Sequence, residues 1–307
     1  MLQKRIKKAD ENIATAYQTR IVAFIDILGF KDIIRESERY PAKLNVIFRA
    51  LKLLKTFEKP KMWDLSLIEF EEDAQKRGLP QFDIRRFSNC SCFSDSIVVS
   101  VEVSDDNINE ITSTIVAHIA NIGARLLMDG VLLRGALTFG NLIHDNDGIV
   151  CGQALIDAYE LEENVSVYPR IVLSDKLIAK LNYPCETKWQ RYPYHQYVKR
   201  FPDGCVGLHQ MSYFEVIQSL SEMDPHALKS NLCRVKQAII NGLDNSFQEP
   251  SIYKKFEWLR TEYQKLIILC EGAKEPFHEL NENISGNNIH YSYTDKFYTK
   301  RHHRSTL

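Results

Sequence analysis

The distribution of apolar residues predicts strands that are buried on both faces and helices with one apolar face. Residues 21–27 are apolar except for Asp26, which is typical of a central strand. Further strands are predicted at residues 84–89, 97–103 and 131–139. Isoleucines recur at helical spacing between the last two of these strands, after a capping segment at 104–106. This order indicates an α+β fold, an α/β sandwich with the ferredoxin-like βαββαβ arrangement.

The segments between and after these strands complete the predicted core. Residues 30–57 have helical spacing, and Pro41 interrupts it, so two helical pieces are expected. The stretch 59–83 is charged and is predicted to be a surface insertion. After the fourth strand, a helix is expected to open at Gly152, followed by a strand over 169–174 and another helix.

The chain is therefore divided into four parts. They are an N-terminal segment (1–20), an α+β core (21–180), a strand or hairpin with a C-terminal helical extension (181–280), and a polar tail (281–307). The extension contains predicted helices at 226–242 and 251–270. The tail is too polar to form a core, and we expect it to be disordered or loosely docked.

Charge and cysteine content narrow the possible partners and compartment. Lys plus Arg number 39 against 40 Asp plus Glu, so the net charge is −1. Neither direct nucleic acid binding nor attraction to an anionic membrane is expected, and an anionic ligand must be held locally. The seven cysteines are scattered, and the N-terminus has no apolar signal core, which predicts reduced thiols in a cytoplasmic protein. No run approaches the roughly 18 apolar residues that a membrane span needs.

Two aspartates stand out against this pattern. Asp26 ends the first strand, where a desolvated carboxylate costs several kcal/mol unless a cation or hydrogen bonds compensate it. Asp95 lies in the turn before the third strand. In the predicted topology these two strands are antiparallel neighbours, which would bring the aspartates together. Alternatively, Asp26 could cap a helix and Asp95 could be an ordinary turn residue.

A pair of carboxylates at such a strand junction would suit two divalent cations. Oxygen ligands favour Mg²⁺ or Mn²⁺. Two ions about 3.5–4 Å apart could activate a sugar hydroxyl and neutralise a triphosphate. Gly29 follows Asp26 closely, and the turn that it permits would present unpaired N–H groups of the next helix to phosphate.

Two further residues could serve the same site. Phe24 shares a strand face with Asp26 and could stack on a base or ribose, although a strand phenylalanine is more often part of the core. Arg134 lies in the fourth strand and could carry positive charge to the phosphates or the transition state. It could equally pair with a structural carboxylate.

Several motifs together resemble the catalytic domain of class III nucleotide cyclases over roughly residues 18–180. The motifs are Phe24 to Phe30, Ser94-Asp95-Ser96, Arg134 to Gly140, and the Gly152 helix with Ala158. The resemblance implies that Asp26 and Asp95 hold the metals, that the backbone at Ile27 helps to coordinate one of them, and that the active site forms across a homodimer interface. It extends the expected substrate contacts to Phe24, Gly29, Phe30, Arg134 and Arg170.

Departures from the family pattern refine this implication. The lysine and aspartate that read adenine in the family would fall on Ser91 and Ile149, so the purine-reading pair is missing. The family's transition-state Asn and Arg would fall on Ile156 and Glu160. A different cation is then needed, and Arg134 or Arg170 is the candidate.

With these departures, Phe93 to Ile97 in the hairpin and the late helix Lys254 to Arg260, the chain resembles the pyrimidine cyclases of bacterial Pycsar anti-phage systems more than adenylate cyclases. The resemblance implies conversion of UTP to 3′,5′-cyclic UMP and pyrophosphate, with the product activating a separate effector. CTP and cyclic CMP are the alternative, because no residue distinguishes uracil from cytosine.

Two rival functions remain. One is a non-catalytic nucleotide-binding module. The other is a diguanylate-type or polymerase-palm phosphotransferase, but the chain lacks the Gly-Gly-Asp-Glu-Phe hairpin that this rival would require.

Overall fold

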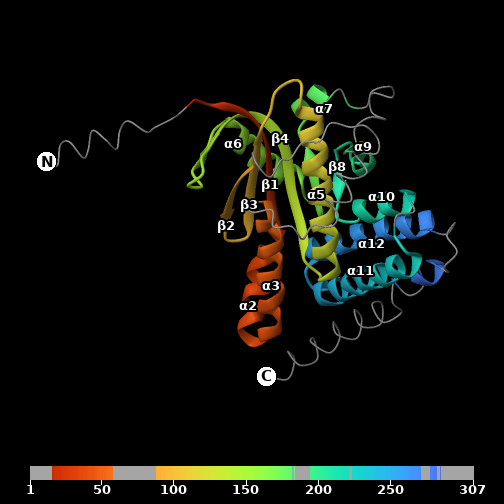
Figure 1. The fold of residues 1–307 in the computed structure, drawn as a ribbon. Coiled ribbons are helices and arrows are strands. Elements are labelled where there is room, and N and C mark those ends of the chain that lie inside the picture. Colours follow the sequence, from red (N-terminus) through yellow and green to blue (C-terminus); the bar gives the residue numbers. More distant parts are fainter. Residues whose placement is uncertain are drawn as a thin grey trace.

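The structure is a computed structural model of the chain. It describes residues 16–57, 88–181, 183, 194–220, 223–270, 277–281 and 284. Within them the protein is an α+β fold built on a mixed sheet (Figure 1). The predicted insertion 59–83, most of the N-terminal segment and nearly all of the polar tail lie outside the described residues.

The sheet follows the strand order expected for the core. Its strands are β1 (Gln18–Leu28), β2 (Ser88–Phe93), β3 (Ser96–Glu102), β4 (Leu132–His144), β5 (Val150–Cys151), β6 (Arg170–Leu173), β7 (Lys199–Arg200) and β8 (Val206–His209). The order is β2-β3-β1-β4-β6-β8-β7, with β5 paired to β4. β1 is antiparallel to both β3 and β4, whereas β4 and β6 are parallel. The apolar run of β1 is thus a central strand, as predicted.

Side chains of β1 alternate between two differently covered faces. Ile21, Ala23, Ile25 and Ile27 belong to the main core. Val22 belongs to a smaller cluster on the other face, against which Phe24 packs. Because successive side chains of a strand point to opposite faces, Asp26 shares the face of Val22 and Phe24.

Helices α3 (Pro41–Leu54), α5 (Ile108–Met128) and α7 (Asp175–Leu181) contribute to the main core, together with the short α9 (Tyr194–Tyr197). α2 (Phe30–Arg39) precedes α3, and a 3₁₀ turn, η2 (Lys55–Phe57), follows it. The predicted break at Pro41 is confirmed: Tyr40 is extended and α3 begins at the proline.

α5 is the central helix of the main core. It is long and apolar enough to span a membrane, but 83% of its most apolar window is buried inside the protein, as in a core helix. The capping segment expected at 104–106 is one residue early. Asn107 precedes the helix, and its side chain accepts a hydrogen bond from the Ser104 N–H at 2.8 Å.

α6 (Gln153–Val165) covers part of the other face of the sheet, where Ala154 and Ala158 meet Val22 and Leu142. It begins after Gly152, whose φ is 142°. A Cβ there would lie 2.6 Å from the Asn141 carbonyl oxygen, so only glycine fits. β4 extends five residues beyond its predicted end at Phe139, and its hairpin with β5 was not foreseen.

The C-terminal extension packs on the core as a second hydrophobic cluster. It comprises α10 (Ser212–Leu220), α11 (Pro225–Ser246), α12 (Pro250–Cys270) and the 3₁₀ turn η4 (Phe277–Leu280). Figure 1 shows α11 and α12 side by side near the end of α5. Leu127 of α5 and Leu132 of β4 share this cluster with Leu259 and Tyr263 of α12. The two helices were predicted, whereas α10 was not.

Candidate functional site

The candidate site lies where β1 ends and β3 begins. Asp26 is paired in register with Ser96 on β3 and with Arg134 on β4. The Ile27 N–H donates a hydrogen bond to the Asp95 carbonyl oxygen at 3.0 Å. The two aspartates, distant in sequence, are therefore neighbours, as the strand order predicted.

Asp26 carries a partly compensated charge. Its side chain is 17% exposed, and Arg134 Nε donates to its Oδ2 at 3.2 Å. Burial raises the pKa of Asp26, while Arg134 acts in the opposite direction and Asp95 adds to the rise. The balance shows that one guanidinium does not fully offset desolvation of this carboxylate.

A third carboxylate, Glu162 of α6, shares Arg134 with Asp26. Its side chain is 3% exposed, and it forms an ion pair with Arg134 Nε. Burial raises its pKa, Arg134 opposes this, and the negative charge of Asp26 contributes to the rise. Sequence reasoning missed Glu162, although a signal was present: Ala154, Ala158 and Glu162 follow one another at intervals of four, which places the glutamate on the buried stripe of α6.

The C-terminal extension adds a second cation. Lys255 of α12 is half-buried and interacts electrostatically with Arg134, Asp26 and Glu162. Burial lowers its pKa, as does Arg134, while the two carboxylates oppose the change. The sequence assigned no chemistry to this extension, because nothing in a helical pattern shows which residue will face a distant strand.

The turn after Asp26 has the expected backbone. Gly29 is exposed, with φ 73°, and precedes α2, whose first turn has no side-chain cap. Phe30, expected to contact substrate, is partly buried and packs against the main core. Phe24 lies on the face of Asp26, but its ring meets Tyr159 edge-on with centroids 5.7 Å apart.

Arg170 lies on β6, next to β4, but its side chain is held by residues other than the two aspartates of the site. Its side chain is 2% exposed and forms an ion pair with Asp203. The guanidinium carbon also lies 5.5 Å from the centre of the Tyr168 ring and 4.8 Å from that of Phe201. These contacts enclose Arg170, so its contact with substrate stays a prediction, and Arg134, which contacts Asp26, is the better-placed candidate.

Ser91, which stands where class III cyclases have the lysine that reads adenine, takes part in a chain of hydrogen bonds. Ser91 Oγ donates to the Gly148 carbonyl at 2.8 Å. It lies 2.9 Å from His144 Nε2, which must then be the donor to Ser91. The one hydroxyl proton of Ser91 is therefore already donated to the Gly148 carbonyl, and only a remaining acceptor lone pair could face a base.

The other departure positions lie at the surface. Ile149 and Ile156 are 62% and 50% exposed. Two other large apolar side chains are also exposed, Tyr159 at 48% and Phe93 at 47%. They come from the β4–β5 turn, α6 and the tip of the β2–β3 hairpin. Large apolar side chains so exposed are typical of contact surfaces when they gather in one region.

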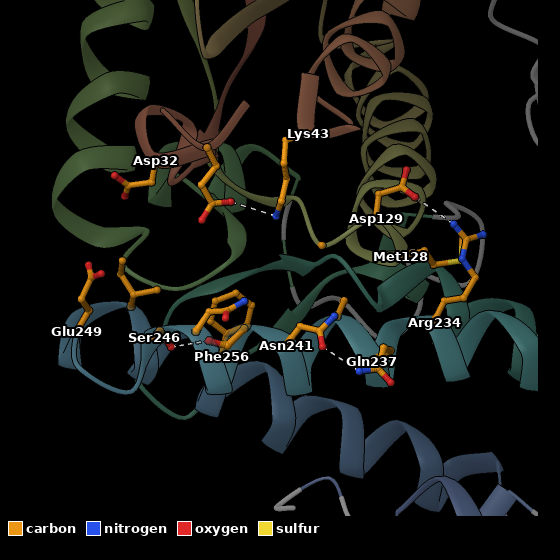
Figure 2. Close-up of a pocket in the computed structure, with 16 residues that line it drawn as sticks. Asp32, Lys43, Met128, Asp129, Arg234, Gln237, Asn241, Ser246, Glu249 and Phe256 are labelled. Carbon is orange, nitrogen blue, oxygen red and sulfur yellow. Dashed lines mark hydrogen bonds and ion pairs between the residues drawn. The ribbon is translucent and has the colours of Figure 1, made fainter. Parts of the chain in front are cut away.

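A separate cavity of about 470 Å³ lies at the junction of α2, α3, the end of α5 and α11 (Figure 2). Gln237 and Asn241 lie along its α11 wall, and Lys43 extends from the opposite wall. Its charges are largely paired, with Lys43 3.2 Å from Glu36 and Arg234 3.0 Å from Asp129. Phe256, next to Lys255 on α12, also lines it, so this helix contacts both the cavity and the Asp26 site.

The donor set fits hard divalent cations, though incompletely. Asp26 and Asp95 offer carboxylate oxygens, and the raised pKa of Asp26 is the mark of a carboxylate that lacks positive charge. In the part of the chain that the structure describes, no group of three or more His, Cys, Asp or Glu could hold a metal by itself. A bound ion would therefore need ligands from its substrate as well, as Mg²⁺ commonly does.

Comparisons with known proteins do not assign this chain to a family. No protein-family model matches it. No curated protein matches it either. The fold and the site therefore define the class only as an α+β protein with a buried carboxylate and guanidinium centre on a mixed sheet.

Proposed function

We propose that the protein is a cytoplasmic, metal-dependent pyrimidine nucleotide cyclase with a class III type catalytic core. UTP is the proposed substrate, and 3′,5′-cyclic UMP and pyrophosphate are the products. Cyclic UMP would act as a second messenger on a separate effector in anti-phage defence. CTP conversion to cyclic CMP is the variant of this proposal that the motifs leave open.

One observation carries the proposal. The strand order places Asp26 directly beside Asp95, with Arg134 as a cation on the adjoining strand. This is the arrangement that the class III resemblance requires of its metal-binding pair. The βαββαβ order around it supports the same class.

The residues would divide the work as follows. Asp26 and Asp95 would hold two Mg²⁺ or Mn²⁺ ions, which supply charge neutralisation and lower the pKa of the 3′-hydroxyl. The 3′ oxygen bonds to the α-phosphorus, the bond from that phosphorus to the β-phosphate oxygen breaks, and the hydroxyl proton passes to solvent. Backbone N–H groups at the Gly29 turn would bind the departing pyrophosphate. Arg134 would stabilise the added charge on the α-phosphate.

A homodimer is part of the proposal, with the active site at its interface. The exposed apolar side chains Phe93, Ile149, Ile156 and Tyr159 support it, because they come from the β2–β3 hairpin next to Asp95, the β4–β5 turn and α6, the helix of Glu162. A second copy that covers them would also exclude water from the site.

The test is incubation of the full chain with each nucleoside triphosphate and Mn²⁺, followed by mass spectrometry of the nucleotide and an assay for pyrophosphate. Cyclic UMP from UTP supports the proposal, and cyclic CMP supports its variant. Linear or dinucleotide products would favour the phosphotransferase rival.

A non-catalytic nucleotide-binding module is the second candidate. It is favoured by Ile156 and Glu160, which stand where the family has its transition-state Asn and Arg. Binding of a triphosphate without any turnover would select this alternative. Asp26→Asn and Asp95→Asn, compared with Asp147→Asn on the exposed β4–β5 turn, would show whether either function depends on the aspartate pair.

A further inference from the structure

Arg134 lies between two carboxylates that come from different elements. Its Nε is 3.2 Å from Asp26 Oδ2 on β1 and forms an ion pair with Glu162 Oε1 on α6. Asp26 is a proposed metal ligand, whereas Glu162 lies on the buried stripe of α6 and is 3% exposed. A divalent cation could therefore bind Asp26 in place of the guanidinium, whereas it could not easily reach Glu162.

This difference matters when metal binds. A guanidinium displaced from Asp26 with no other partner would be an uncompensated, partly buried charge, which is strongly unfavourable. Glu162 removes this problem because it keeps Arg134 paired. Glu162 itself is too buried to exist as a carboxylate without a cation nearby.

We propose that Arg134 is an internal counter-ion that divalent cations replace at Asp26, and that Glu162 is the positioning residue that retains Arg134 beside the site during this exchange. The inference rests on the proposed function for its purpose, since a retained Arg134 can then face the α-phosphate. Its electrostatic part is independent of turnover. Metal binding becomes an exchange of cations at Asp26 rather than a simple addition.

The exchange predicts opposite effects for the two partners. Arg134→Met removes the cation that is hydrogen-bonded to Asp26 and leaves Lys255, which acts on Asp26 through its charge, so Mn²⁺ should bind about tenfold more tightly in the absence of nucleotide. Glu162→Gln leaves Arg134 with Asp26 alone, so Mn²⁺ should bind about tenfold more weakly. Titration of the full chain with Mn²⁺, followed by electron paramagnetic resonance, measures both. Glu163→Gln, an exposed neighbour on α6, is the matched control and should leave Mn²⁺ affinity within about twofold.

The double variant Arg134→Met/Glu162→Gln gives an independent check. It removes the whole ion pair and should bind Mn²⁺ more tightly than Glu162→Gln, because without Arg134 the loss of Glu162 acts only through its direct charge interaction with Asp26. The inference would be overturned if both single variants changed Mn²⁺ affinity in the same direction. It would also be overturned if Arg134→Met bound Mn²⁺ with unchanged or lower affinity.

Turnover separates this inference from the proposed function. If the variants show the predicted changes in Mn²⁺ affinity but the wild-type chain forms no cyclic nucleotide from any triphosphate, the proposed function fails and the cation exchange stands. If the wild-type chain is active and Glu162→Gln has unchanged Mn²⁺ affinity and unchanged kcat, the exchange fails and the function stands.

Discussion

The two ends of the same face of β1 have opposite electrostatic characters. At one end, buried Arg20 donates to Ser100 Oγ at 2.8 Å, and Ser100 Oγ lies 2.8 Å from His144 Nδ1. The chain continues through His144 to Ser91 and the Gly148 carbonyl. At the other end, Asp26 and Glu162 share one guanidinium, and both have raised pKa values.

The difference indicates what each end is for. At the Arg20 end, hydroxyls and amides accept the hydrogen bonds of one buried cation and link it to the β4–β5 hairpin, although burial also lowers the pKa of Arg20. The Asp26 end keeps two desolvated carboxylates that the chain compensates only in part. Perturbed carboxylates of this kind gather at functional sites, where a ligand supplies the missing charge.

The largest expected effect is on activity at the Asp26 end. Asp26→Asn should lower cyclic nucleotide formation by about a thousandfold, because bound metal supplies several kcal/mol of charge stabilisation. The thermal midpoint should not fall, because the burial that raises the pKa of Asp26 also makes its charge unfavourable to folding. A variant that is active, or one that is unfolded by circular dichroism, would contradict the functional assignment of this end.

The next largest effect is a dependence of protein stability on pH that arises at the Arg20 end. Burial lowers the pKa of His144 from 6.5 to about 4, with a further contribution from Arg20. The folded state therefore favours neutral His144. This stabilisation is complete above pH 6.5 and is lost as the pH falls from 6.5 through about 4, by roughly 3 kcal/mol in total.

Denaturant unfolding at pH 7 and pH 4 measures this loss. Comparison with His144→Gln isolates the histidine, since the variant should lose less stability over the same interval by about that amount. An identical pH dependence in both proteins would show that His144 is not held neutral and that the Arg20 end is not a closed network.

Added metal and nucleotide should raise the thermal stability of the protein only when the Asp26 end is intact. At about 100 times the dissociation constant, a ligand that binds the folded state alone adds about 2.7 kcal/mol. The thermal midpoint of the wild-type chain should rise with Mn²⁺ and UTP, whereas that of Asp26→Asn should not. Ser100→Ala at the other end should retain the full rise, so an equal response of all three proteins would argue against metal binding at Asp26.

The smallest effect is expected from a single hydroxyl. Ser91→Ala removes the acceptor for His144 Nε2 and the donor to the Gly148 carbonyl, which should cost about 1–2 kcal/mol of unfolding free energy. Ser96→Ala on β3, whose side chain makes a hydrogen bond of 3.3 Å within its own turn, is the matched control. If Ser91→Ala instead changes the choice between UTP and CTP, Ser91 contacts the base and the interpretation of this end is wrong.

The strand order and the meeting of Asp26 with Asp95 could be predicted from the sequence alone. The apolar run before Asp26 requires a central strand, and alternation along it places Phe24 and Asp26 on one face. These features depend on local pattern and on the few topologies that such a pattern allows, and the break at Pro41 is equally local.

The partners of these residues were decided by tertiary structure. Arg134 and Arg170 are both arginines on strands, yet packing pairs one with Asp26 and Glu162 and encloses the other between Asp203 and two aromatic rings. Lys255 joins the site only because α12 shares a hydrophobic cluster with Leu132 of β4. The energy of a charge depends on its burial and on the charges around it, and both arise from segments far apart in sequence.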